Sequence, residues 1–183
     1  MRYLALLRGI NVGGKKKVAM SELRECIEQA GLADASTYIN SGNIFFSSNA
    51  TDEVTLVKTC EAAIEKRFGF AVVVMVISQH DYVDAMKHAP KWWGGGRQTG
   101  VRSDALFVIP PKTTGEVRKA LKVKPDAPYT FAEHGQVIFW SLPMEKYSKS
   151  VVPKIIGTPI YKSVTIRSST TAYKLLNLFQ PTD

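Results

Sequence analysis

The chain has few of the residues that build disulfides, metal sites or membrane spans. Its 183 residues include two cysteines, Cys26 and Cys60, and three histidines, none in a spacing typical of zinc or redox motifs. No apolar run reaches the roughly 18 residues that a membrane-spanning helix needs. The N-terminus lacks the long apolar stretch and small-residue cleavage site of a signal peptide. We therefore expect a cytoplasmic protein without membrane contact, metal or cofactor.

Negative charge is scarce in the second half of the chain. The protein has 24 Lys and Arg residues against 16 Asp and Glu residues, a formal net charge of +8. Residues 1–90 hold ten of each kind, so residues 91–183, with fourteen basic and six acidic residues, carry the whole excess. This asymmetry favours an anionic partner, either nucleic acid or another polyanion. The alternative is a basic surface that serves only solubility.

Hydrophobic periodicity predicts the same order of elements twice. In the first half we expect strands at 2–8, 37–39, 44–46 and 71–77, with helices over about 20–30 and 53–68. In the second half we expect strands at 105–109, 129–131, 137–140 and 163–167, with helices over 113–121, 149–156 and 170–179. Each half therefore follows the order β-α-β-β-α-β, and the second half adds a C-terminal helix.

This order predicts an α+β fold of two tandem ferredoxin-like (βαββαβ, alpha-beta plait) units, related by duplication of the element order. The first unit spans 1–77, and the second, with its C-terminal helix, spans 104–183. Residues 78–103 join them through a helix over 78–89 and the stretch Trp92-Trp93-Gly94-Gly95-Gly96. The two tryptophans either pack between the units, which we favour, or stack on bases.

The loop after the first strand approaches a phosphate-binding motif. Gly9-Ile10-Asn11-Val12-Gly13-Gly14-Lys15-Lys16 matches G-x-x-x-x-G-K-[ST] except at the last position, where a lysine replaces the hydroxyl that binds magnesium. The following helix also begins several residues later, near Met20. Nucleoside triphosphate hydrolysis is therefore not expected. The glycine N–H groups and Lys15 to Lys17 still suit a phosphate, and the alternative is a solvated glycine turn.

Two further clusters combine cations with hydroxyls near predicted helix starts, where unpaired N–H groups attract anions. Lys146-Tyr147-Ser148-Lys149-Ser150 lies at the start of the helix expected over 149–156. Arg167-Ser168-Ser169-Thr170-Thr171 lies at a strand-to-helix junction, where Ser168 or Ser169 alternatively serves only as the helix N-cap. In the first half, Asn40-Ser41-Gly42-Asn43 offers ligand-binding side chains, although a hairpin turn also explains it.

These observations favour binding of a phosphate-bearing ligand, with nucleic acid among the candidates. The candidate ligand-binding residues are Arg8, Asn11, Gly13, Gly14, Lys15, Lys17, Asn40, Ser41, Asn43, Tyr147, Lys149, Ser150, Arg167 and Thr170. No catalytic constellation is recognisable, so the sequence does not decide whether the protein is an enzyme. The alternatives are an enzyme that acts on a phosphorylated small molecule and a protein-interaction module anchored by Trp92-Trp93.

Two segments of the sequence resemble those of a known protein family. Leu6-Leu7-Arg8-Gly9-Ile10-Asn11-Val12-Gly13-Gly14 and Tyr38-Ile39-Asn40-Ser41-Gly42-Asn43-Ile44-Phe45-Phe46 resemble the uncharacterised bacterial family catalogued as domain of unknown function 1697. The similarity is specific over 3–47 and extends more thinly through Trp92-Trp93, Tyr147 to Ser150 and Thr165 to Leu176. The resemblance implies two ferredoxin-like units and no assigned activity. The family's usual Arg-Asn-Trp-type run is here Arg167-Ser168-Ser169, so any ligand contact of that Asn or Trp is not carried over.

Overall fold

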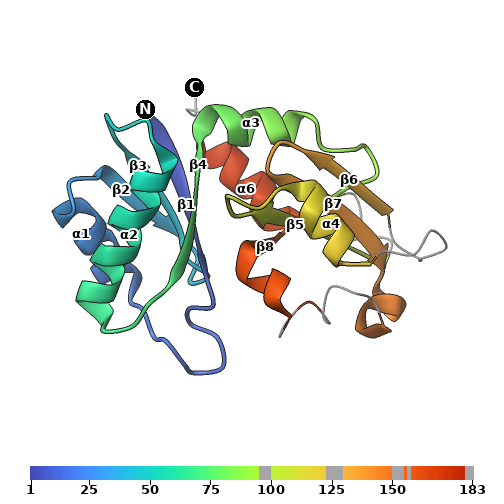
Figure 1. The fold of residues 1–183 in the computed structure, drawn as a ribbon, viewed down its shortest axis with the longest axis horizontal. Coiled ribbons are helices and arrows are strands. Elements are labelled where there is room, and N and C mark those ends of the chain that lie inside the picture. Colours follow the sequence, from blue (N-terminus) through green and yellow to red (C-terminus); the bar gives the residue numbers. More distant parts are fainter. Residues whose placement is uncertain (95–99, 123–129, 150–154, 156–157, 180–183) are drawn as a thin grey trace. The chain divides into compact units, whose positions relative to one another are not determined.

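The computed structural model describes residues 1–94, 100–122, 130–149, 155 and 158–179. The chain divides into two compact units, Met1–Tyr82 and Val83–Asp183. Each unit contains one four-stranded antiparallel sheet, and helices accompany both sheets (Figure 1). The predicted α+β class is confirmed. Among the described residues, no helix combines the length and hydropathy that a bilayer crossing requires.

The first sheet has the order β2-β3-β1-β4. Its strands are β1 (Arg2–Arg8), β2 (Ala33–Tyr38), β3 (Asn43–Ser47) and β4 (Val73–Ser78). Helices α1 (Met20–Gln29) and α2 (Glu53–Phe68) contact each other and pack beside this sheet (Figure 1). Leu23 and Ile64 bring the helices into one buried cluster with Tyr3, Ala5 and Leu7 of β1.

Local chemistry sets the bounds of α2. The side chain of Asp52 accepts hydrogen bonds from the N–H groups of Val54 and Thr55, so the helix begins with a satisfied first turn. It ends at Gly69, whose φ of 75° is left-handed.

The strand expected over 37–39 begins earlier, at Ala33. Asp34 has a φ of 55° and the pairing shifts register between Ala33 and Ser36, so this stretch lacks the alternation that signals a strand.

The second sheet has the order β6-β7-β5-β8. Its strands are β5 (Val101–Val108), β6 (Thr130–His134), β7 (Val137–Pro143) and β8 (Val164–Ser168). Helix α3 (Gln79–Lys87) contains the division between the units. The second unit also holds α4 (Thr114–Ala120), α6 (Ser169–Phe179) and the 3-10 helices η2 (Met144–Lys149) and η3 (Pro159–Ser163).

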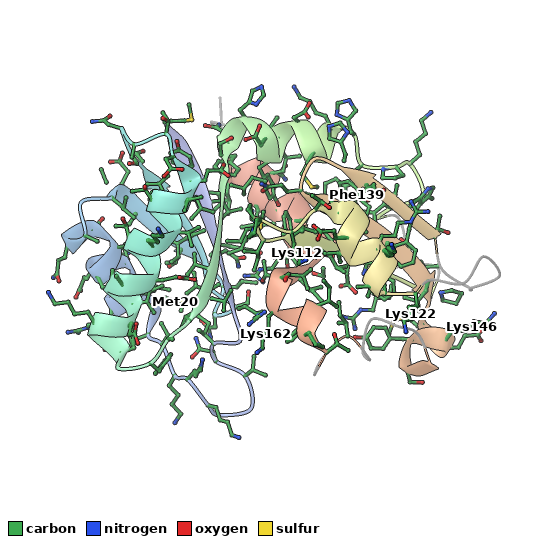
Figure 2. All side chains as sticks on the ribbon, in the orientation of Figure 1. Met20, Lys112, Lys122, Phe139, Lys146 and Lys162 are labelled. Carbon is green, nitrogen blue, oxygen red and sulfur yellow. The ribbon has the colours of Figure 1, made fainter. Side chains whose placement is uncertain are left out.

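Both faces of the second sheet are apolar. Leu106 and Trp140 form a buried cluster with Val117 of α4. Phe139, the neighbour of Trp140 in the chain, is also fully buried and is labelled in Figure 2. Because successive strand residues point to opposite faces, Phe139 belongs to the other face. Helix α6 contacts β5 and β8 and buries Ala172, Leu175 and Phe179.

Two predicted segments differ from the structure or fall outside it. Trp93 packs inside the second unit, with its ring centroid 4.9 Å from that of Phe139, whereas Trp92 is partly exposed. Of the helix expected over 149–156, only Lys149 and Ile155 lie within the described residues. Lys149 ends η2, so Lys146 to Lys149 lie inside a 3-10 helix and do not start an α-helix. The glycines at 95 and 96 lie outside the described residues.

Candidate functional site

A cavity of about 390 Å³ lies in the second unit, where β5 begins and β8 passes into α6. The antiparallel pairing of β5 with β8 sets Asp104 opposite Ser168, so the start of one strand meets the end of the other. The wall also includes a residue of η2. The lining residues are Val101, Arg102, Ser103, Asp104, Met144, Ser168, Ser169 and Thr170.

Arg102 places a fixed positive charge at this cavity. Its Nε donates to Oδ2 of Asp104 at 2.7 Å, and its guanidinium carbon lies 4.0 Å from the ring centroid of Tyr147. Burial raises the pKa of Asp104, and the hydrogen bond from Arg102 opposes this effect. The arginine side chain is 37% exposed and the aspartate side chain 2%. A guanidinium has five N–H donors. A single carboxylate cannot use all of them, so the Arg102 side chain can also bind a second anion.

The first turn of α6 forms another side of the cavity. The hydroxyl of Ser168 accepts a hydrogen bond from the N–H of Thr171 at 3.3 Å, so Ser168 is the N-cap of this helix. This confirms one alternative considered from the sequence. The N-terminus of an eleven-residue helix carries a partial positive charge. The exposed residues Ser168 and Thr170 add hydroxyl groups beside it.

The structure separates the predicted residues of the second unit. Thr170 lines the cavity. The ring of Tyr147 packs against Arg102, which also lines the cavity. Arg167 does not line it: this buried side chain turns along its own strand, where Nη1 donates to Thr165 Oγ1 and to the Ile166 carbonyl, each at 3.0 Å. The side chain of Lys149 and the whole of Ser150 lie outside the described residues.

In the first unit, Asn11 holds the base of the predicted Gly-Lys loop, residues 9–17. Its Oδ1 accepts from the N–H of Val18 at 2.9 Å, and its Nδ2 donates to the carbonyls of Val18 and Asn40, each at 3.0 Å. These bonds give Asn11 a structural role. They also bring the loop beside the turn at Asn40.

The rest of this loop faces solvent. Gly13 and Gly14 have φ values of 59° and 73° and are exposed, as are Lys15 and Lys17. Lys16 is anchored, because its Nζ donates to the carbonyl of Ala71 at 2.7 Å. The start of α1 at Met20 agrees with the expected gap between loop and helix. The loop thus presents two lysines and two glycine amides to solvent.

The turn residues of the first unit mainly build the hairpin between β2 and β3. Asn43 is fully buried, and its Nδ2 donates to the Tyr38 carbonyl at 2.8 Å and to Ser41 Oγ at 3.1 Å. Asn40 uses its carbonyl to accept from Asn11. Arg8 ends β1 opposite Val73 and is half-exposed. The turn interpretation therefore accounts for Asn43 and Ser41, whereas Asn40 contributes only its backbone carbonyl to these contacts.

Sequence reasoning missed Arg102 and Asp104. The available signal was the polar run Arg102-Ser103-Asp104, with two opposite charges two residues apart, ahead of the apolar part of the same strand. It also left unassigned a group formed by Asp84, His88 and His134, whose ligand atoms lie within 4.8 Å of one another. The spacing of Asp84 and His88, four residues apart on a predicted helix, was a usable signal. The position of His134 was not, because it depends on the tertiary fold.

Comparison with known proteins identifies the family to which this chain belongs. A family model described as protein of unknown function (DUF1697) matches residues 1–139. The chain belongs to the DUF1697 family. The resemblance carried by the loop and hairpin phrases is therefore confirmed. The DUF1697 match includes the Gly-Lys loop and β5 with Arg102 and Asp104, whereas Ser168 to Thr170 lie beyond it.

A solved structure supports the fold of this DUF1697 chain. It is the structure of conserved bacterial protein SP0830 from Streptococcus pneumoniae, which is 32% identical in sequence. The similarity covers 98% of each chain with a TM-score of 0.84. No curated protein matches the chain.

Proposed function

We propose that this DUF1697 protein binds a phosphate-bearing ligand in the cavity between β5, η2 and the start of α6. The observation that carries the proposal is the convergence of Arg102, the N-terminus of α6 and the hydroxyls of Ser168 and Thr170 on one cavity. A volume of about 390 Å³ falls within the range of small-molecule sites. A mononucleotide, free or as one unit of a nucleic acid, has suitable size and charge.

The surroundings of Arg102 favour an oriented anion contact. Asp104 engages the Nε edge of the guanidinium, and the Tyr147 ring supports its face. Packing on an aromatic face suits arginine, whose planar cation is weakly hydrated. The remaining donor edge offers the paired N–H groups that bind two phosphate oxygens together. The hydroxyl groups of α6 and its partial positive charge complement the same anion.

The wider charge distribution supports the same ligand class. Exposed lysines of the second unit include Lys112, Lys122, Lys146 and Lys162, which Figure 2 labels. Residues 91–183 carry the entire net charge of +8. A positive field of this kind raises the association rate of polyanions and weakens as salt concentration rises.

Thr170→Glu tests the cavity with little risk to the fold. A carboxylate in the first helical turn suits the helix but repels a phosphate. Asn177→Glu is the matched control, because this exposed residue lies on the same helix, outside the cavity, and the charge change is equal. Calorimetry with AMP and ADP and anisotropy with labelled single-stranded RNA and DNA should show at least tenfold weaker binding for Thr170→Glu. Equal binding by both variants, or binding of none of these probes by the wild type, would refute the proposal.

We propose the Gly-Lys loop as a second phosphate contact, made when the ligand is a nucleic acid. Lys15 and Lys17 are exposed beside two glycine amides. Replacing both lysines with alanine should reduce the slope of log affinity against log salt by about two contacts. Lys58→Ala combined with Lys66→Ala on α2 is a control for net charge. An unchanged slope in the loop variant would remove the loop from the interface.

We also propose that each unit is ferredoxin-like and that the two arose by duplication. Both sheets place their strands in the order second, third, first, fourth. The first unit follows β1-α1-β2-β3-α2-β4, which is the split β-α-β arrangement. A cytoplasmic, reducing setting is part of the same proposal, and the free, buried thiols of Cys26 and Cys60 are compatible with it.

A further inference from the structure

We propose that Asp84, His88 and His134 form a binding site for a divalent transition-metal ion of the zinc class. The site lies in the second unit and shares no residue with the cavity at α6. The observation behind it is that one carboxylate and two imidazoles bring their ligand atoms within 4.8 Å of one another. Metal binding here would be independent of phosphate binding.

Two structural elements supply the three side chains. Asp84 belongs to α3, and the N–H of His88 donates to the carbonyls of Asp84 and Ala85, each at 3.2 Å, so the helical turn continues through His88. Residues four apart on a helix share a face. His134 ends β6, where the chain turns through Gly135 at a φ of 54°. The hairpin thereby brings the second imidazole to the helix face.

The distances describe a compact donor set around the carboxylate. Asp84 Oδ2 lies 2.7 Å from His134 Nε2, and Asp84 Oδ1 lies 3.4 Å from His88 Nδ1. Zinc binds such ligands at about 2.0–2.1 Å, so donors in a tetrahedral site are about 3.4 Å apart. An ion between Asp84 and His134 therefore needs their two atoms to separate by less than about 1 Å. It would take the place of the hydrogen bond.

One ring is already oriented by a backbone group. His88 Nδ1 lies 2.9 Å from the carbonyl oxygen of Asp84. A carbonyl oxygen only accepts, so Nδ1 carries a hydrogen in this contact and Nε2 of the neutral ring holds the lone pair. An ion beside the carboxylate therefore requires His88 to release this carbonyl and turn, so that a ring nitrogen with a lone pair faces Asp84.

Metal binding requires one of the two imidazole rings to turn from its position in the metal-free structure. The imidazoles of His88 and His134 are stacked, with centroids 3.9 Å apart and planes 5° apart. A metal lies close to the plane of each imidazole that binds it, so parallel rings do not share an ion without tilting. The His88 side chain is 55% exposed and that of Asp84 47%, whereas His134 is 35% exposed. We expect His88 to turn, since it is the most exposed of the three.

The donor set selects the class of ion. Two imidazoles and one carboxylate suit Zn²⁺, Co²⁺ or Ni²⁺, whereas Mg²⁺ and Ca²⁺ prefer oxygen ligands alone. Three protein ligands leave at least one coordination position for water. The partial exposure of all three side chains gives an ion direct access from solvent.

Zinc binding by the full-length, tag-free protein tests this site. After treatment with EDTA, calorimetry with ZnCl₂ should show one ion per chain, and Co²⁺ should give the visible absorption of a site with nitrogen and oxygen ligands. His88→Ala, His134→Ala and Asp84→Asn should each weaken binding at least tenfold. His80→Ala is the matched control, because His80 lies on the same helix beside Asp81, outside the cluster, with its side chain 86% exposed. It should leave binding unchanged.

Three outcomes would overturn the proposal. The first is wild-type zinc binding no tighter than that of His88→Ala combined with His134→Ala. The second is a loss in His80→Ala equal to that in His88→Ala. The third is an intense near-ultraviolet cobalt–thiolate band, which would place the ion at Cys26 or Cys60. Circular dichroism and unfolding midpoints of the metal-free variants should match the wild type, which separates lost binding from lost folding.

Discussion

The indole N–H of Trp93 donates a hydrogen bond to the backbone carbonyl of Asp104, with the two heavy atoms 3.0 Å apart. This bond braces β5 at the residue whose side chain holds Arg102 beside the cavity. Trp93 is 2% exposed, whereas Trp92 is 39% exposed. Adjacent tryptophans therefore have different roles: one supports the candidate site from inside the unit, and the other faces solvent.

Substitution of Trp93 should lower the stability of the protein, whereas substitution of Trp92 should mainly change its fluorescence quenching. Trp93→Phe leaves the carbonyl of Asp104 without its indole donor and should lower the free energy of unfolding by about 1–3 kcal/mol. Trp92→Phe should change stability little but remove most of the fluorescence that iodide quenches, because Trp140 is also buried. Urea unfolding and iodide quenching of both variants are the measurements. Quenching that persists in Trp92→Phe would contradict the assigned burial of Trp93.

Gly42 should tolerate no side chain. Its φ is 77°, and a Cβ there would lie 2.7 Å from Leu7 Cβ and 2.8 Å from Ile10 Cδ1. Gly42→Ala combines backbone strain with overpacking and should cost about 2–5 kcal/mol. Gly14→Ala is the matched control, since Gly14 has a similar φ of 73° and nothing within 4 Å of a Cβ. It should cost only the strain, about 1–2 kcal/mol. Equal losses in chemical denaturation would exclude the steric contribution.

The two thiols should be inert while the protein is folded. Burial raises the pKa of Cys60 to about 12 and also raises the pKa of Cys26. Since the thiolate is the reactive form, iodoacetamide at pH 8 should modify neither residue at an appreciable rate. Unfolding in urea should expose both to full alkylation, measured by intact mass. Cys26 is 6% exposed and Cys60 fully buried, so any slow reaction of the folded protein should begin at Cys26.

Asp104 should make stability depend on pH in an identifiable direction. Burial raises the pKa of this carboxyl above its ordinary value, so the folded state binds its proton more tightly than the unfolded state. Its stabilising contribution is present below the ordinary pKa and is lost as pH rises through the raised one. The free energy of unfolding of the wild type, relative to Asp104→Asn, should therefore increase on acidification from pH 7 to pH 4. A relative decrease would mean that the ion pair with Arg102 outweighs the effect of burial.

The parts of the fold that the sequence predicted are those with strong local signals. β1 and β7 are nearly continuous apolar runs, and Gly69 closes α2 with a residue suited to a left-handed conformation. β2 was placed too late, because Ala33-Asp34-Ala35-Ser36 has little strand propensity and its pairing with β3 supplies the structure. Local patterns decide element type most reliably where both propensity and periodicity agree.

The candidate site was predicted less well, because tertiary contacts decide which residues share a cavity. Thr170 was found from its place at a strand-to-helix junction, and its neighbours Arg102 and Asp104 are far away in the chain. Arginine is a residue type that commonly binds phosphate. The alternation of side chains along β8 nevertheless turns Arg167 inward, where the Thr165 hydroxyl and the Ile166 carbonyl accept its hydrogen bonds. Residue type alone pointed to a cation in this segment, whereas the direction of its side chain depended on the register of β8.

The bonds of Asn11 to Val18 have a consequence for protein engineering. A single carboxamide closes the loop at its base by pairing with both backbone groups of Val18, which ties the end of β1 to the segment just before α1. Residues 12–15 at the tip are exposed, and such tips are where chains accept inserted peptides and where proteases cut first. An epitope or a different recognition sequence inserted between Gly13 and Gly14 should leave the first sheet intact, which makes this loop a natural place to graft new binding specificity.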